Sequence, residues 1–147
     1  MSAQTTAPPV LRKVTVAVDA ERAFEVFTRR IGDWWPLQGY SCFGENAAGV
    51  SFEADQIVER STSGEEAVWG EILAWEPPSR IAFTWHPGHE DGAPKTEVEV
   101  RFRAHGGSTV VELEHTGWER LGEGWEETRS GYENGWPAVL DLFAQAI

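Results

Sequence analysis

The sequence predicts an α+β domain in which a curved antiparallel β-sheet wraps around a long C-terminal α-helix. Residues 124–147 carry apolar side chains at three- and four-residue spacings, which places them on one stripe of a helix. Upstream, several short segments alternate apolar and polar residues, as strands do in a sheet with one wet face. Because the dry face of such a sheet needs a cover, we expect the helix to lie across it with a cavity between them.

Local signals place the remaining elements in order. Residues 1–9 are small, polar and proline-bearing and are expected to form a disordered tail, which leaves residues 10–147 as a single domain. A strand over residues 10–18 is followed by a helix over residues 20–30 that Asp19 caps. Further strands are predicted over residues 50–59, 67–75, 80–86, 96–104 and 109–115.

Two segments depart from regular patterning. Pro137 lies inside the C-terminal helix and lacks a backbone donor, so we expect a kink or a restart near Trp136. The run Trp34-Trp35-Pro36 predicts a compact bend after the first helix. This bend either plugs one end of the core or forms one wall of a ligand mouth.

Composition excludes several classes of partner and environment. Twelve Lys and Arg against twenty-four Asp and Glu give a net charge of -12, which disfavours nucleic acid and anionic membrane surfaces. The single cysteine, Cys42, cannot form an intramolecular disulfide, which fits a reducing compartment. The sequence shows neither a signal-peptide pattern nor an apolar run of membrane-spanning length. We therefore expect a soluble, cytoplasmic protein.

Tryptophan is unusually frequent, with eight residues in a chain of 147. Large aromatic side chains can fill a core, but each buried indole N–H then needs an acceptor. Rigid amphipathic rings also suit the wall of a cavity. We favour the aromatic-lined cavity, with a plain packed core as the alternative.

The ordered motifs resemble a known superfamily. They are Val14-Thr15-Val16 with the following helix, the Trp34-Trp35-Pro36 bend, Gly70-Glu71-Ile72 before Trp75-Glu76-Pro77-Pro78, the strand from Arg80 to Trp85, and Gly135-Trp136 with Leu140 and Phe143. Together these resemble the START-like or Bet v-like helix-grip superfamily, also written SRPBCC, over residues 10–147. The branch is similar to the activator of the ninety-kilodalton heat-shock protein's ATPase. The resemblance implies a deep cavity that holds lipids, sterols, flavonoids or polyketide intermediates in several branches, and it implies no particular reaction.

Few residue groups predict chemistry. His86 and His89 have the spacing of a zinc pair, but Pro87 and Gly88 separate them and a solvated turn is the better interpretation. His115 either contacts a ligand or acts as a base inside the cavity, or it is a satisfied structural histidine. Glu71 lies among aromatic residues and is the other candidate for a titrating group. We predict no catalytic residues, no metal and no cofactor.

Three functions remain open. The first is a binding protein for a small hydrophobic molecule, a lipid, a sterol or an aromatic polyketide-like compound. The second is an enzyme of the cyclase, dehydratase or hydrolase type in the same cavity, and the third is a co-chaperone-like module that binds a protein partner. The predicted cavity lining is Trp35, Tyr40, Trp69, Phe83, Trp85, Phe102, His115, Trp118, Tyr132 and Trp136.

Overall fold

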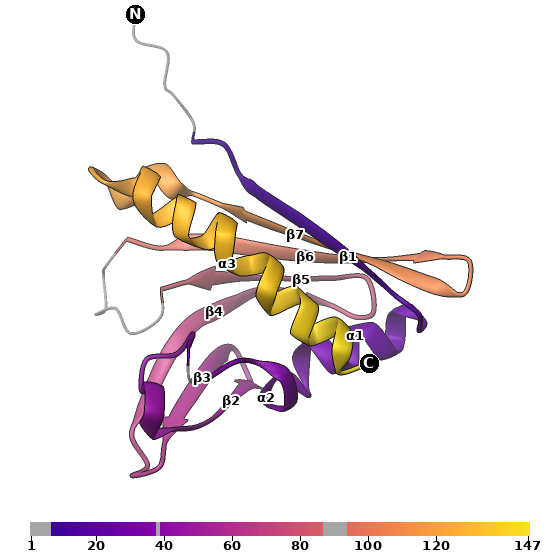
Figure 1. Cartoon of the computed structure of the whole chain (residues 1–147), viewed down its shortest axis with the longest axis horizontal. Coiled ribbons are helices and arrows are strands. Elements are labelled where there is room, and N and C mark those ends of the chain that lie inside the picture. The colour runs from indigo at the N-terminus through magenta and orange to yellow at the C-terminus, as the bar shows by residue number, and fades with distance from the viewer. Residues whose placement is uncertain (1–6, 38, 87–93) are drawn as a thin grey trace, which may run out of the picture.

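The computed structural model describes residues 7–37, 39–86 and 94–147. It confirms the predicted α+β architecture, a single antiparallel sheet with a long C-terminal helix lying across it (Figure 1). The seven strands are ordered β1-β7-β6-β5-β4-β3-β2 in the sheet. Their bounds are β1 Val10–Val16, β2 Ala47–Glu53, β3 Gln56–Ser61, β4 Glu66–Glu76, β5 Arg80–Trp85, β6 Thr96–His105 and β7 Ser108–Thr116.

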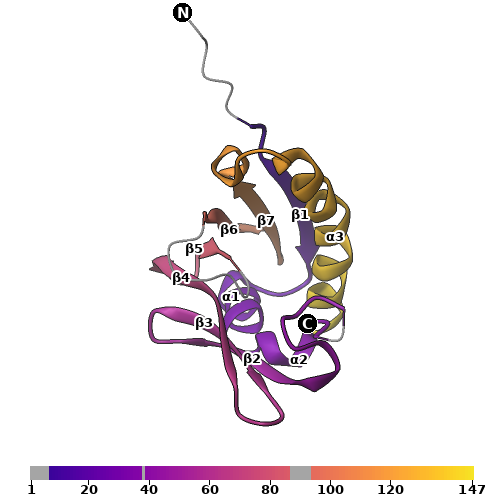
Figure 2. The ribbon, with the colours of Figure 1, turned by 90° about the vertical axis from the view of Figure 1, so that its left-hand side faces the viewer.

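The sheet curls around the helices, so that its two ends lie on different sides of the molecule (Figure 2). Helix α3 (Trp125–Gln145) packs beside β1. Helices α1 (Ala20–Thr28) and α2 (Ile31–Trp34) lie inside the curve, α1 against β6 and β7 and α2 against β2. Two short 3-10 turns, Gly44–Asn46 and Trp118–Leu121, complete the elements. No helix in the described part of the chain is both long and apolar enough to cross a membrane.

One predicted strand is wrong. Residues 50–59 were expected to form one strand, whereas the chain reverses at Ala54 and Asp55 between β2 and β3. Ala54 adopts a φ of 46°, a left-handed conformation that usually favours glycine or asparagine. Because alanine rather than glycine or asparagine holds this position, Asp55 alone did not signal the hairpin.

Helix α3 runs without a break through Pro137, so the predicted restart near Trp136 is also wrong. Proline removes the N–H that would bond to the carbonyl of Glu133, four residues earlier. The Arg12 guanidinium from β1 donates to this carbonyl oxygen at 3.1 Å. A side chain of the sheet therefore satisfies the group that the proline leaves free, and the helix continues.

A second arginine ties the start of the domain to α3. Arg129 donates to the carbonyl oxygens of Pro8 and Pro9 at 2.8 and 2.9 Å. Ala7 is buried against the core. Of the segment 1–9 that was expected to be a tail, residues 7–9 are thus packed against the domain, and residues 1–6 lie outside the described part.

Helix α1 fills one half of the curved sheet. The Phe24 and Phe27 rings pack edge-on against Phe102 of β6, with ring centroids 5.2 and 5.8 Å apart. Trp34 closes the same region from α2, with its indole nitrogen donating to the Val26 carbonyl at 2.8 Å. The cavity between α3 and the sheet lies toward the other half, beside β4 and β5.

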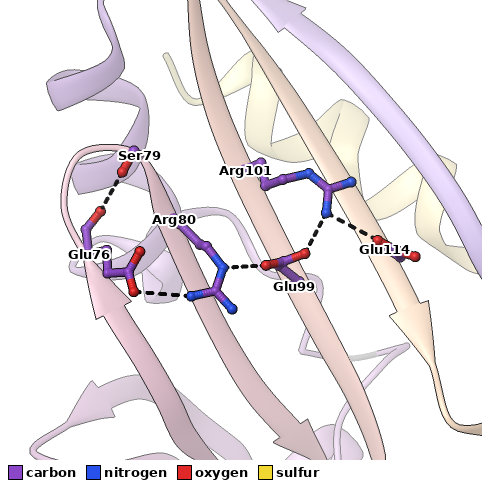
Figure 3. Close-up of polar contacts among 6 residues, drawn as sticks. All are labelled: Glu76, Ser79, Arg80, Glu99, Arg101 and Glu114. Carbon is purple, nitrogen blue, oxygen red and sulfur yellow. Dashed lines mark hydrogen bonds and ion pairs between the residues drawn. The ribbon is translucent and has the colours of Figure 1, made fainter.

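The outer face of the sheet is a ladder of alternating charges across four strands (Figure 3). Arg80 bridges Glu76 and Glu99, and Arg101 bridges Glu99 and Glu114. Arg103 of β6 pairs likewise with Glu112 of β7 at 2.6 Å. Each such pair adds little stability in water, but together they keep this face polar.

Candidate ligand-binding cavity

A cavity of about 410 Å³ lies between α3, the strands β4 and β5, and the segment 39–42. Its volume falls within the range of roughly 300–1,000 Å³ that small-molecule sites occupy. The side exposed to solvent is formed by Tyr40 and by the first turns of α3. The lining residues are Trp35, Gly39, Tyr40, Ser41, Cys42, Trp69, Trp85, Glu127, Thr128, Gly131, Tyr132, Gly135, Trp136 and Val139.

The inner wall of the cavity is a cluster of four tryptophans from four different elements. Trp35 follows α2, Trp69 lies on β4, Trp85 ends β5, and Trp136 lies on α3. Each is at most 8% exposed, and neighbouring ring centroids are 5.0 to 6.0 Å apart. Aromatic pairs at these separations attract one another, so the cluster is a rigid apolar surface.

Every indole N–H of this cluster already has an acceptor in the protein. Trp35 donates to the Tyr40 carbonyl at 2.7 Å and Trp69 to the Glu59 carboxylate at 2.8 Å. Trp85 donates to the Tyr132 hydroxyl at 2.9 Å, and Trp136 donates to a ring nitrogen of His115 at 3.0 Å. The tryptophans therefore offer a ligand ring surface rather than hydrogen-bond donors.

Glu59 of β3 is a buried carboxylate that fixes one side of the cavity. It is 0% exposed and accepts hydrogen bonds from the backbone N–H groups of Cys42 and Phe43 at 2.7 and 3.0 Å, besides that of Trp69. These bonds hold the segment 39–42 against the sheet. Sequence reasoning missed Glu59, although its alternation with Ile57 and Ser61 in one strand places it on their face.

Cys42 lies in the cavity wall beside this carboxylate. Although the residue as a whole is exposed, partial burial of its thiol, together with the charge and hydrogen bond of Glu59, raises its pKa to about 11. The thiol is therefore protonated at neutral pH. Since the thiolate is the nucleophile, Cys42 is not poised for covalent chemistry.

The cavity brings together six of the ten predicted lining residues: Trp35, Tyr40, Trp69, Trp85, Tyr132 and Trp136. The other four lie elsewhere in the core. Phe102 faces α1, and Phe83 packs against Phe52 and Trp85. Trp118 and His115 lie behind Tyr132, at centroid separations of 5.5 and 5.0 Å. At the bend over residues 34–36, Trp34 is buried in the core, as the first alternative expected, and Trp35 lines the inner wall of the cavity.

His115 is a fully satisfied structural histidine. Because an indole can only donate, the bond from Trp136 requires the His115 Nδ1 atom to be an acceptor, so Nε2 carries the proton. Nε2 lies 2.7 Å from the Thr96 hydroxyl, which donates in turn to the Trp85 carbonyl at 3.2 Å. Burial lowers the pKa of His115 to about 3. His115 lies outside the cavity lining and both of its ring nitrogens are already hydrogen-bonded, so it does not fit the general-base role.

The other predicted candidates do not form a chemical centre. Glu71 is exposed and pairs with Lys95 at 2.8 Å, an interaction that lowers its pKa. His89 lies outside the described residues, and the described part of the chain contains no cluster of side chains suited to a metal ion. A second hollow of about 470 Å³ lies between α1 and Pro77-Pro78, and its lining is largely charged.

Residues 17–147 match the model of a family described as activator of Hsp90 ATPase homolog 1-like protein. The chain belongs to this family. The match confirms the resemblance to this branch of the helix-grip superfamily. A comparison with curated proteins found no match.

Several solved structures resemble this one over nearly the whole chain. An anthrahydroquino-gamma-pyrone synthase, Txn09, is 35% identical with a TM-score of 0.66, covering 97% of this chain and 98% of that one. CalC from Micromonospora echinospora, described as a self-sacrificing resistance protein, is 28% identical with a TM-score of 0.63, covering 95% and 93%. Protein MLL2253 from Mesorhizobium loti shares the fold at 18% identity and a TM-score of 0.67, covering 93% and 94%.

Proposed function

We propose that this protein binds a small, planar aromatic molecule of the polyketide type in the cavity between α3 and the sheet. The observation that carries the proposal is the cluster of four indoles whose N–H groups are all satisfied internally. Such a surface gains free energy from stacking and from burial of apolar area, and it gives no preference to polar ligands. A flat ring system contacts ring faces over more area than a flexible fatty acid chain does, and it loses less conformational entropy on binding.

The similarity to a synthase of a gamma-pyrone supports the aromatic class of ligand. That relative is 35% identical over nearly the full length of both chains, and its name describes a fused aromatic product. The two titrating side chains that line the inner cavity, Cys42 and Tyr132, both have raised pKa values. Both groups hold their protons at neutral pH, which favours binding over base catalysis.

Gly131 offers a direct test of the site. It lies at the centre of the stripe of α3 that lines the cavity, and a Cβ atom added there meets no other atom within 4 Å. Gly131→Leu places an apolar side chain in the cavity, and it also removes a helix-interior glycine that costs about 1 kcal/mol relative to alanine. A tryptophan variant is a poorer test, because truncating Trp136 leaves His115 without its donor.

The assay is equilibrium dialysis against xanthone, a planar tricyclic ketone. We expect saturable binding at one site per chain, a loss of at least about tenfold in affinity for Gly131→Leu, and an unchanged or raised melting temperature. Gly131→Ala is the matched control, since its single methyl leaves most of the volume free. Equal affinity of Gly131→Leu and Gly131→Ala for xanthone would show that the ligand lies elsewhere.

A ring-closing enzyme is the second candidate, favoured by the name of the 35% identical relative. The test reaction is closure of 2-hydroxydibenzoylmethane to flavone, in which the phenol oxygen attacks the distal carbonyl and water leaves. Faster flavone formation with the protein than with Gly131→Leu would establish catalysis in the cavity. Equal rates would leave binding as the function.

The structure disfavours a broad apolar docking surface. The outer face of the sheet is the charge ladder, and the large apolar side chains exposed in the described residues are Leu11, Tyr40, Leu73 and Trp75. Of these, Trp75 packs against Phe24 and Phe52. Leu11 lies on β1, Tyr40 in the segment 39–42, and Leu73 and Trp75 on β4, so these side chains come from separate parts of the chain, whereas a specific apolar interface needs a contiguous patch.

A further inference from the structure

Few polar groups line the inside of the cavity, and most of them already interact with other groups of the protein. The four indole N–H groups bond to protein acceptors, and the Ser41 hydroxyl bonds to the Leu37 carbonyl. The Cys42 thiol lies beside the Glu59 carboxylate, and burial together with this charge raises its pKa to about 11, so it stays protonated. Glu127 and Thr128 are exposed at the start of α3 and belong to the mouth. The Tyr132 hydroxyl is left as the inner group to consider.

The hydroxyl group of Tyr132 accepts a hydrogen bond but donates none to the described residues. Its oxygen accepts the Trp85 N–H at 2.9 Å, and no acceptor for its own O–H is present among the described residues. A phenol can accept and donate at the same time, so its proton is available to a group in the cavity. Burial raises the pKa of Tyr132, which keeps the hydroxyl protonated and therefore a donor at neutral pH.

The surroundings of Tyr132 hold this donor in place. Its ring packs against Trp118 and His115 on one side, at centroid separations of 5.5 and 5.0 Å, and against Trp136 at 6.2 Å. The bond from Trp85 fixes the position of the oxygen, and accepting a hydrogen bond strengthens the O–H as a donor. The hydroxyl is thus preorganised at the edge of the tryptophan cluster, where the rim of a stacked ring would lie.

We propose that the Tyr132 hydroxyl donates a hydrogen bond to a ring carbonyl of the ligand, so that the cavity selects planar aromatic ketones over aromatic hydrocarbons of the same shape. This inference rests on the proposed function, because it assumes that an aromatic molecule occupies the cavity. Pyrones, quinones and xanthones carry such an acceptor on the edge of a flat ring. The fixed donor sets the orientation of the ring, and the indoles supply the stacking surface.

The test compares xanthone with xanthene, in which a CH₂ group replaces the carbonyl. Equilibrium dialysis measures both dissociation constants for the unmodified protein, for Tyr132→Phe and for Ser79→Ala. Ser79 is the control, since Ser79→Ala also removes one hydroxyl, but from the exposed turn between β4 and β5, outside the cavity lining. Tyr132→Phe should weaken the binding of xanthone roughly three- to tenfold and change the binding of xanthene little, whereas Ser79→Ala should change neither.

A second measurement needs no variant. The infrared carbonyl stretch of xanthone bound to the unmodified protein should lie below its value in an apolar solvent, as expected of a hydrogen-bonded ketone. An unshifted band would overturn the inference, as would equal affinities for xanthone and xanthene that Tyr132→Phe leaves unchanged. If the unmodified protein binds neither compound, the proposed function itself fails, so the two failures are distinguishable.

Discussion

His115 allows a quantitative prediction about stability and pH. The imidazole is 0% exposed, and burial lowers its pKa from 6.5 to about 3. In the unfolded chain the imidazole binds a proton as the pH falls through 6.5, whereas in the folded protein it stays neutral until about pH 3. Between these two values the unfolded state binds more protons, so the free energy of unfolding must fall as the pH falls.

The size of the effect follows from the two pKa values. Where the unfolded state binds one more proton than the folded state, the free energy of unfolding falls by about 1.4 kcal/mol per pH unit. Lowering the pH from 7.5 to 5.0 should therefore reduce the free energy of unfolding by about 2 kcal/mol through His115 alone. The hydrogen bonds and charge of Arg60 lower the pKa of Glu53. The stability that such a carboxylate contributes to the fold is lost only when the pH falls near or below its ordinary pKa of 4.5. The interval from pH 7.5 to 5.0 therefore separates the histidine from the acids.

The assay is urea unfolding at both pH values for the unmodified protein, His115→Gln and His105→Gln. Glutamine can still accept from Trp136 and donate to Thr96, but it cannot titrate. We expect the stability loss between pH 7.5 and 5.0 to be about 2 kcal/mol smaller in His115→Gln. His105 is exposed in the hairpin between β6 and β7, so His105→Gln should follow the unmodified protein. An equal pH dependence in all three proteins would refute the neutral, buried histidine.

Two further predictions concern the wall around Glu59. Glu59→Gln should destabilise the fold by roughly 1–3 kcal/mol, because the NH₂ group of glutamine would point at N–H groups that now donate to a carboxylate oxygen. Glu53→Gln, on the exposed side of the sheet, should cost less. Chemical unfolding measures both losses of stability, and equal losses would contradict the role of Glu59 as a buried anchor. Cys42 should react slowly with iodoacetamide at pH 7.5, because its raised pKa leaves little thiolate. Its rate should increase in Glu59→Gln, and a rate equal to that of a free thiol in the unmodified protein would contradict the assignment.

Periodicity predicted most of the fold because strands and the long helix depend on local alternation. The reversal at Ala54 escaped prediction, since alanine is not a residue that signals a positive φ. The restart predicted near Pro137 was wrong because the cost of a proline in a helix depends on long-range contacts. The carbonyl of Glu133 finds another donor in Arg12, 121 residues away in the sequence.

The cavity was predictable only in its residue types. Aromatic residues could be recognised in the sequence as candidates for the cavity lining. Which of them line the cavity and which pack in the core depends on where α1 lies. Phe102 contacts Phe24 and Phe27 because α1 occupies that half of the curved sheet. The rings of Trp118 and His115 pack against Tyr132, and this contact depends on how α3 lies against β7 and the turn that follows β7. The burial of Glu59 depends on hydrogen bonds from the backbone N–H groups of residues 42 and 43. The pattern of residues in its own strand does not predict these donors.

The proposed function requires that an aromatic ligand stacks on the cluster of four indoles in the cavity. Proton–nitrogen NMR resolves one indole N–H signal for each of the eight tryptophans and can follow them during a titration with xanthone. We expect large shifts for the cavity signals and small ones for Trp34, Trp75 and Trp125, which do not line the cavity. The cavity signals are those of Trp35, Trp69, Trp85 and Trp136. Saturating shifts confined to tryptophans outside the cavity, or no shifts at all, would contradict it.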